Sequence, residues 1–220
     1  MKRLLLIAFS TALLWTLPIN HAAAQMLQGR DYMPVATPQP TDDRSKIEVI
    51  EFFWYGCIHC YHLEAPLNAW LKTKPADVQF RRVPAVFNPS WVPLTRTYYA
   101  LEALGVVDKY HAAIFDAIHV QGKRNLVADP NAIANWLAGK GLDKQKFLAA
   151  YNSFAVNSRA QRAQDLTSVY GIDGTPTLVV NGKYLIAPSM DGYATGGNID
   201  YGLFFRNVDQ LIAQERKGRK

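Results

Sequence analysis

The residues of this chain best suited to chemistry are its two cysteines, Cys57 and Cys60, which form a single Cys-x-x-Cys motif. No other cysteine occurs among the 220 residues. A disulfide between them closes so small a loop that it removes little conformational entropy from the unfolded chain, so it is a poor structural crosslink. The spacing instead favours a pair that is oxidised and reduced in turn by thiol–disulfide exchange.

The flanking sequence predicts how the two sulfurs are positioned. Residues 47–53 form a β-branched and aromatic run typical of a buried strand, and residues 57–72 carry apolar side chains at helical spacing. Cys57 is thus expected at the helix start, where unpaired N–H groups and the helix dipole stabilise a thiolate, with Cys60 one turn inside. A protonated His59 would add to this stabilisation. Because a stable thiolate favours the reduced pair, the disulfide form is expected to be a strong oxidant.

Zinc binding is the alternative chemistry for residues 57–62, which contain His59 and His62 as well as both cysteines. Neighbouring turns of one helix cannot surround a tetrahedral ion with four ligands, and the sequence has no second cysteine–histidine cluster. We therefore predict no metal. His62, His111 and His119 are predicted to be surface or groove histidines.

The rest of the pattern predicts a mixed α/β fold. Asn181-Gly182 is a strong hairpin signal between two short strands. We predict an arm at residues 25–46, a strand at 47–53, a helix at 57–72 and a second strand at 78–83. A helical block at 90–169, a hairpin at 177–186 and a closing helix at 204–212 follow.

Two motifs resemble a known family. Residues 49–61, Val-Ile-Glu-Phe-Phe-Trp-Tyr-Gly-Cys-Ile-His-Cys-Tyr, resemble the active-site region of DsbA-type periplasmic thiol:disulfide interchange proteins of the thioredoxin superfamily, and residues 174–177, Gly-Thr-Pro-Thr, resemble their cis-proline loop. The resemblance implies an α/β thioredoxin fold with an inserted helical domain. The implied division is a signal peptide at residues 1–24 and an N-terminal arm at 25–46. A thioredoxin-like domain comprises residues 47–89 and 166–220, and the inserted helical domain comprises residues 90–165.

The resemblance also implies roles for individual residues. Cys57, Cys60 and His59 would be catalytic, and Glu51 matches a buried acid that relays a proton to or from Cys60. A glutamate in a strand could instead face solvent. Arg82, on the neighbouring strand, is the candidate charge partner of Glu51.

The expected substrate-binding residues are Thr175 and Pro176, on the loop opposite the cysteines. Two positions depart from the family pattern, since Ile58 stands where proline is frequent and Thr175 where valine is frequent. The dipeptide between the cysteines tunes the redox potential in this family, and about 30 mV corresponds to 1.4 kcal/mol for a two-electron couple.

The N-terminus has the pattern of a secretory signal. Lys2 and Arg3 precede an apolar stretch at residues 4–17, and an Ala-x-Ala site ends at residue 24. Without the two basic leader residues the net charge of +6 becomes +4, which the four basic residues within 216–220 account for. The body is therefore neutral, which argues against nucleic-acid binding, and the basic end is predicted to be a frayed terminus.

The predicted function is a periplasmic dithiol oxidase that passes the Cys57–Cys60 disulfide to newly exported proteins with free cysteines. The resemblance implies reoxidation by a quinone-linked membrane protein of the DsbB type. We expect no cofactor, no metal, no nucleic acid and a monomeric protein. The alternatives are an isomerase or reductase of the same superfamily, and a peptide-binding assembly factor with an incidental cysteine pair.

Overall fold

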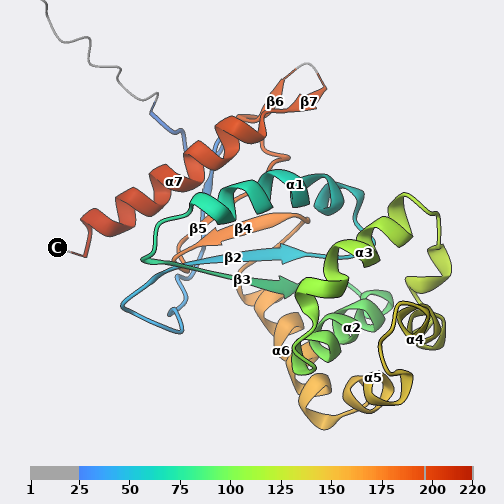
Figure 1. The fold of residues 1–220 in the computed structure, drawn as a ribbon. Coiled ribbons are helices and arrows are strands. Elements are labelled where there is room, and N and C mark those ends of the chain that lie inside the picture. The colour runs from blue at the N-terminus through green and yellow to red at the C-terminus, as the bar shows by residue number, and fades with distance from the viewer. Residues whose placement is uncertain (1–24, 196, 220) are drawn as a thin grey trace, which may run out of the picture.

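A mixed five-stranded sheet forms the centre of the molecule (Figure 1). The structure, a computed structural model, describes residues 25–195 and 197–219, so the predicted signal peptide lies outside the described residues. The strand order is β1-β5-β4-β2-β3, with β2 parallel to β3 and antiparallel to β4. The strands are β1 (Met33–Pro34), β2 (Ile47–Phe53), β3 (Val78–Pro84), β4 (Thr177–Val180) and β5 (Tyr184–Ile186), and a separate pair is β6 (Ala194–Thr195) and β7 (Asn198–Ile199).

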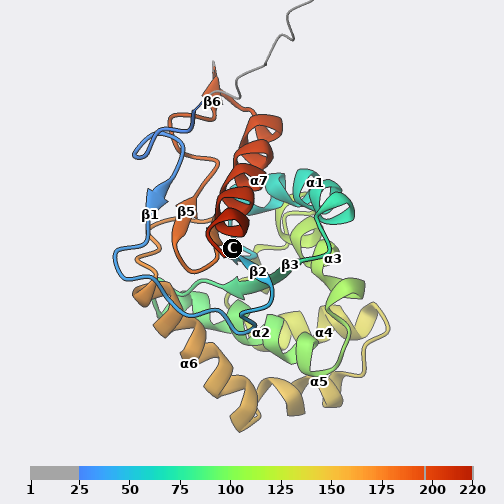
Figure 2. The ribbon, with the colours of Figure 1, turned by 90° about the vertical axis from the view of Figure 1, so that its left-hand side faces the viewer.

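Helices cover both faces of this sheet. Figures 1 and 2 show α1 and α7 on one side, and α2 and α6 on the other. The helices are α1 (Ile58–Thr73), α2 (Val92–Ala103), α3 (Val107–His119), α4 (Pro130–Gly139), α5 (Lys144–Tyr151), α6 (Phe154–Val169) and α7 (Tyr201–Lys217), with short 3₁₀ turns η1 (Pro89–Trp91) and η2 (Arg124–Leu126). This arrangement confirms the predicted α/β fold with a helical block between the two halves of the sheet.

Strand β2 is buried along its whole length because it lies between these two helical layers. Val49 packs into a core shared with α1 and α7, whereas Ile50 and Phe52 belong to a second core shared with the helical block. The central strand is thus fixed from both sides, and its carboxyl end leads directly into the cysteine motif.

The hairpin between β4 and β5 turns where the sequence predicts it. Asn181 and Gly182 both have positive φ, 52° and 68°, which the two-residue turn requires. Residues 25–46 contribute more than an arm, because β1 pairs antiparallel with β5 at the sheet edge. A two-residue strand that contains a proline leaves no recognisable sequence pattern.

The prediction of a frayed basic terminus is wrong for Arg216. This residue lies in α7, and its guanidinium donates two hydrogen bonds to Asp77, each 2.8 Å long.

The predicted domain boundary between residues 165 and 166 falls inside α6. The division into domains stays a prediction. No helix in the described part of the chain is long and apolar enough to cross a membrane.

Candidate active site

The two cysteines lie where β2 passes into α1, and their environments differ. Cys57 is the N-cap residue of α1 and is half-buried, whereas Cys60 lies in the first turn and is completely buried. Both are free thiols. The backbone N–H of Cys57 donates to Trp54 O at 3.0 Å, which closes the turn before the helix. Only the first sulfur can therefore be reached by another molecule.

Hydrogen bonds toward the Cys57 sulfur lower its pKa to about 5. The largest contribution is the hydrogen bond with the Cys60 side chain, and the Thr175 side chain and the backbone N–H groups of Cys60 and His59 add to it, while burial opposes them. Burial raises the pKa of Cys60 well above that of a free thiol. The pair thus combines a stabilised thiolate with a protonated, buried thiol.

The Gly-Thr-Pro-Thr loop lies against Cys57. The Thr175–Pro176 peptide bond is cis, and the Cys57 thiol donates to Thr175 O at 3.3 Å. The Thr177 hydroxyl donates to Gly174 O at 2.8 Å and ties the loop to the start of β4. The structure therefore brings both predicted substrate-binding residues to the reactive sulfur, although they are more than a hundred positions away in sequence.

The side chains between and after the cysteines point outward. Ile58 is 40% exposed, and His59 and His62 are exposed too, with ring centroids 6.4 Å apart. The backbone N–H of His59 contributes to the lowered pKa of Cys57. Among residues 25–195 and 197–219, no group of three or more histidine, cysteine, aspartate or glutamate side chains is placed to hold a metal ion.

Glu51 lies in the fully buried part of β2, not toward solvent. The parallel register places it opposite Arg82, whose Nε donates to Glu51 Oε2 at 2.9 Å, so the predicted pairing is present. The other carboxylate oxygen, Oε1, is buried without a hydrogen-bond partner. Burial raises the pKa of Glu51 to about 8; the charge of Arg82 opposes this increase and that of Glu64 adds to it. The Glu51 carboxyl group therefore holds its proton at neutral pH. Its charge, when ionised, raises the pKa of Cys60, so the two groups interact.

Three further polar residues extend this buried cluster. Arg82 Nη2 also contacts Glu64 Oε1 at 3.5 Å, His111 Nε2 lies 3.2 Å from the same oxygen, and His111 Nδ1 lies 2.8 Å from the Tyr55 hydroxyl. The prediction of a surface or groove position is wrong for His111, which is 5% exposed. Glu64 could have been found by its place on the buried face of α1, one turn after Cys60, but nothing in the sequence points to His111.

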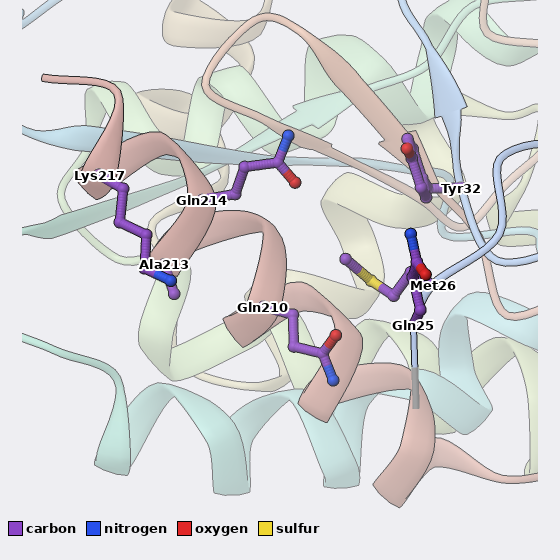
Figure 3. Close-up of a pocket in the computed structure, with 7 residues that line it drawn as sticks. All are labelled: Gln25, Met26, Tyr32, Gln210, Ala213, Gln214 and Lys217. Atoms are coloured by element: carbon purple, nitrogen blue, oxygen red, sulfur yellow. The ribbon is translucent and has the colours of Figure 1, made fainter. Parts of the chain in front are cut away.

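A pocket of about 420 Å³ lies between the start of the described chain and α7 (Figure 3), and it is lined by Gln25, Met26, Tyr32, Gln210, Ala213, Gln214 and Lys217. None of the predicted site residues lines it. Because Cys57 is half-buried and Ile58 beside it is 40% exposed, the cysteine site opens to the surface, which suits a polypeptide partner better than an enclosed small molecule.

A mixed sheet with this cysteine pair at a strand-to-helix junction, opposed by a cis-proline loop, defines a thiol–disulfide protein of the thioredoxin fold. Residues 48–195 match the model of the DSBA-like thioredoxin domain family, and the chain belongs to that family. It is 46% identical over 191 residues to a thiol:disulfide interchange protein DsbA of Azotobacter vinelandii, covering 87% of this chain and 85% of that protein.

Solved structures agree with this assignment. The crystal structure of Pseudomonas aeruginosa DsbA matches with a TM-score of 0.78 and 40% identity, covering 87% of this chain and 95% of that one. The oxidoreductase DsbA from Xylella fastidiosa matches with a TM-score of 0.77 and 34% identity, covering 87% of this chain and 98% of that one. The likeness therefore includes both the thioredoxin-like sheet and the helical block.

Proposed function

We propose that this protein is a thiol:disulfide oxidoreductase that works as a dithiol oxidase, donating a Cys57–Cys60 disulfide to exported proteins. The observation that carries the proposal is the contrast between the two sulfurs. The pKa of half-buried Cys57 is lowered to about 5, and that of buried Cys60 is raised. Stabilising the Cys57 thiolate stabilises the reduced pair, which makes the disulfide a better oxidant.

The reaction begins when a client thiolate attacks Cys57 Sγ. A bond forms between the client sulfur and Cys57, the Cys57–Cys60 bond breaks, and the electron pair leaves with Cys60. A second client thiolate then attacks the client sulfur of this mixed disulfide and releases the Cys57 thiolate. The client loses two electrons and the protein gains them.

Cys60 takes up a proton in the first step, because its burial disfavours a thiolate. We assign Glu51 as the proton donor, since it is buried and has an unpaired Oε1, and since its pKa of about 8 keeps it protonated at neutral pH. Thr175 and Pro176 are assigned to the client backbone, since the thiol of Cys57 already donates to Thr175 O.

The proposed setting is the periplasm, because residues 1–24 have the pattern of a cleavable secretory signal. The reduced protein must pass its two electrons to an oxidant before another client can be served. The family resemblance supports a quinone-linked membrane protein of the DsbB type in that role.

The test uses a reduced peptide with two cysteines as the client. We expect one equivalent of the oxidised protein to convert it to the disulfide form, and we expect Cys57→Ser to leave it reduced. A wild-type protein that binds the peptide without oxidising it supports the assembly-factor alternative. A reduced protein that reshuffles a mispaired client faster than the oxidised protein forms new disulfides supports the isomerase.

A further inference from the structure

The buried polar cluster extends beyond Glu51 to His111 of the helical block, which contacts Glu64. We propose that His111 is a positioning residue for the proton donor: by holding Glu64 ionised against Arg82, it keeps the transferable proton on Glu51. The inference rests on the proposed function, because it concerns the proton that Cys60 takes up.

The hydrogen-bond partners of His111 suit a neutral imidazole. An ionised Glu64 can only accept, so His111 Nε2 donates to Glu64 Oε1 across 3.2 Å. The Tyr55 hydroxyl then donates to the free lone pair of His111 Nδ1 across 2.8 Å. Both ring nitrogens are thus satisfied in the neutral form.

The surroundings of His111 also favour a neutral ring. The rings of Phe53 and Phe115 lie edge-on to the imidazole, with centroids 5.3 and 5.2 Å away, and the Tyr98 ring lies 6.3 Å away. Burial in this aromatic cage lowers the pKa of His111, and the charge of Arg82 lowers it further, whereas Glu64 and Asp108 oppose this decrease.

A count of charges shows why one proton stays in the cluster. Two carboxylates, Glu51 and Glu64, share one guanidinium, that of Arg82, through contacts of 2.9 and 3.5 Å. With His111 neutral, two ionised carboxylates would leave an unbalanced negative charge in the interior, so one of them keeps a proton.

His111 decides this distribution in favour of Glu51. Burial alone would raise the pKa of Glu64, but the hydrogen bond from His111, the charge of Arg82 and the hydrogen bond from Asn68 lower it. The ionised Glu64 in turn neutralises part of the Arg82 charge and raises the pKa of Glu51. Glu51, with its unpaired Oε1, is consequently the protonated member.

The decisive experiment titrates the Glu51 carboxyl carbon by NMR in the oxidised protein, with the signal assigned by its loss in Glu51→Gln. In His111→Leu we expect the Glu51 midpoint to fall by about one unit or more, because Glu64 then takes the proton and Arg82 pairs fully with Glu51. Glu64→Gln should shift the midpoint in the same direction, and the double variant should show no additional shift.

Two further variants separate positioning from packing. His111→Gln retains an N–H that can reach Glu64, so it should restore the wild-type midpoint. His119→Leu removes another histidine of α3, one that contacts Tyr55 O at 2.8 Å and no carboxylate, and should leave the midpoint unchanged. An unchanged midpoint in His111→Leu, with a shift in Glu64→Gln, would overturn the role of His111.

The same variants give a kinetic readout in client oxidation. Protonated Glu51 supports the departure of Cys60, so the advantage of wild type over Glu51→Gln should disappear above a pH of about 8 and at a lower pH in His111→Leu. A wild-type protein that oxidises no client refutes the proposed function, whatever the titration shows. Client oxidation that is lost in Glu51→Gln but has the same pH limit in His111→Leu refutes only this inference.

Discussion

At the scale of single residues, the reactivity of the site comes from unequal solvation of two identical groups. The Cys57 sulfur lies at a helix start, where side-chain and backbone donors replace the water that burial removes. The Cys60 sulfur, one turn later, belongs to a buried apolar core, and burial disfavours its thiolate. Each unit of separation between two pKa values corresponds to about 1.4 kcal/mol, so a modest change of position produces a large chemical difference.

We predict one acidic thiol titration in the reduced protein, with a midpoint near the Cys57 pKa of about 5. Thiolate absorbance measured against pH should show it in wild type and in Cys60→Ser, where the hydroxyl can still donate to Cys57. The same titration should be absent from Cys57→Ser. Its survival there would reverse the assignment of the two sulfurs.

The exposed imidazole of His59 should have only a small effect on the thiolate. His59→Ser keeps the backbone N–H that contributes to the low Cys57 pKa. Because exposed charges contribute at most about 1 kcal/mol, we expect the Cys57 pKa to rise by less than about one unit. The thiolate absorbance titration measures this shift, and an increase of about two units or more would show that the imidazole itself holds the thiolate.

At the scale of elements, the sequence predicted those strands and turns whose structure depends on residues close together in the chain. The run at 47–53 and the Asn181-Gly182 turn were predictable because strand burial and positive φ leave clear signals in composition. Strand β1 was not, because it consists of two residues held by pairing with β5. Its position is set by a long-range contact that no local pattern encodes.

The same distinction applies to the site. The cysteines, Glu51 and the Gly-Thr-Pro-Thr loop were found from motifs, and the Arg82 partner followed from adjacent strands. His111 escaped because its partner Glu64 lies 47 positions earlier, on another helix, and burial there depends on how α3 packs against α1. A histidine among apolar helix residues looks the same whether it faces solvent or a buried carboxylate.

The hairpin turn gives a prediction at this scale. Gly182→Ala should destabilise the protein more than Gly171→Ala, although both glycines have φ near +65°. An alanine Cβ at Gly171 meets open space and costs about 1 kcal/mol in backbone conformation, whereas one at Gly182 overlaps the Gln39 carbonyl and costs roughly 1–3 kcal/mol more. Urea unfolding of both variants measures the difference. Equal losses would show that residues 37–40 move away without cost.

At the scale of the whole molecule, the site couples redox state to folding. A thiol whose pKa is lower in the folded protein stabilises the fold above its unfolded pKa, and that contribution is lost as pH falls through the folded value. For Cys57 the two values are 9.0 and about 5. The oxidised protein has no thiol to titrate, so its stability lacks this contribution.

We therefore predict that the reduced protein gains stability relative to the oxidised protein as pH rises from about 5 toward 9. Urea unfolding of both forms across this range measures the difference in their free energies of unfolding. The contribution of Glu51 to the pH dependence cancels to first order in this difference, because both forms contain Glu51. The entropic effect of the disulfide is a constant offset. In reduced Cys57→Ser the pH-dependent gain should be missing; a gain that persists there would have to come from another group.

The central claim, that the stabilised Cys57 thiolate makes the disulfide an oxidant, is tested most directly by the redox equilibrium of the protein with glutathione at neutral pH. The fraction of oxidised protein is measured after equilibration in buffers with different ratios of reduced to oxidised glutathione. We predict that the reduced protein predominates even where most of the glutathione is oxidised, since the thiolate holds the pair in the reduced state. A Cys57–Cys60 disulfide that persists in mostly reduced glutathione would contradict the claim and indicate a reductase or a structural disulfide.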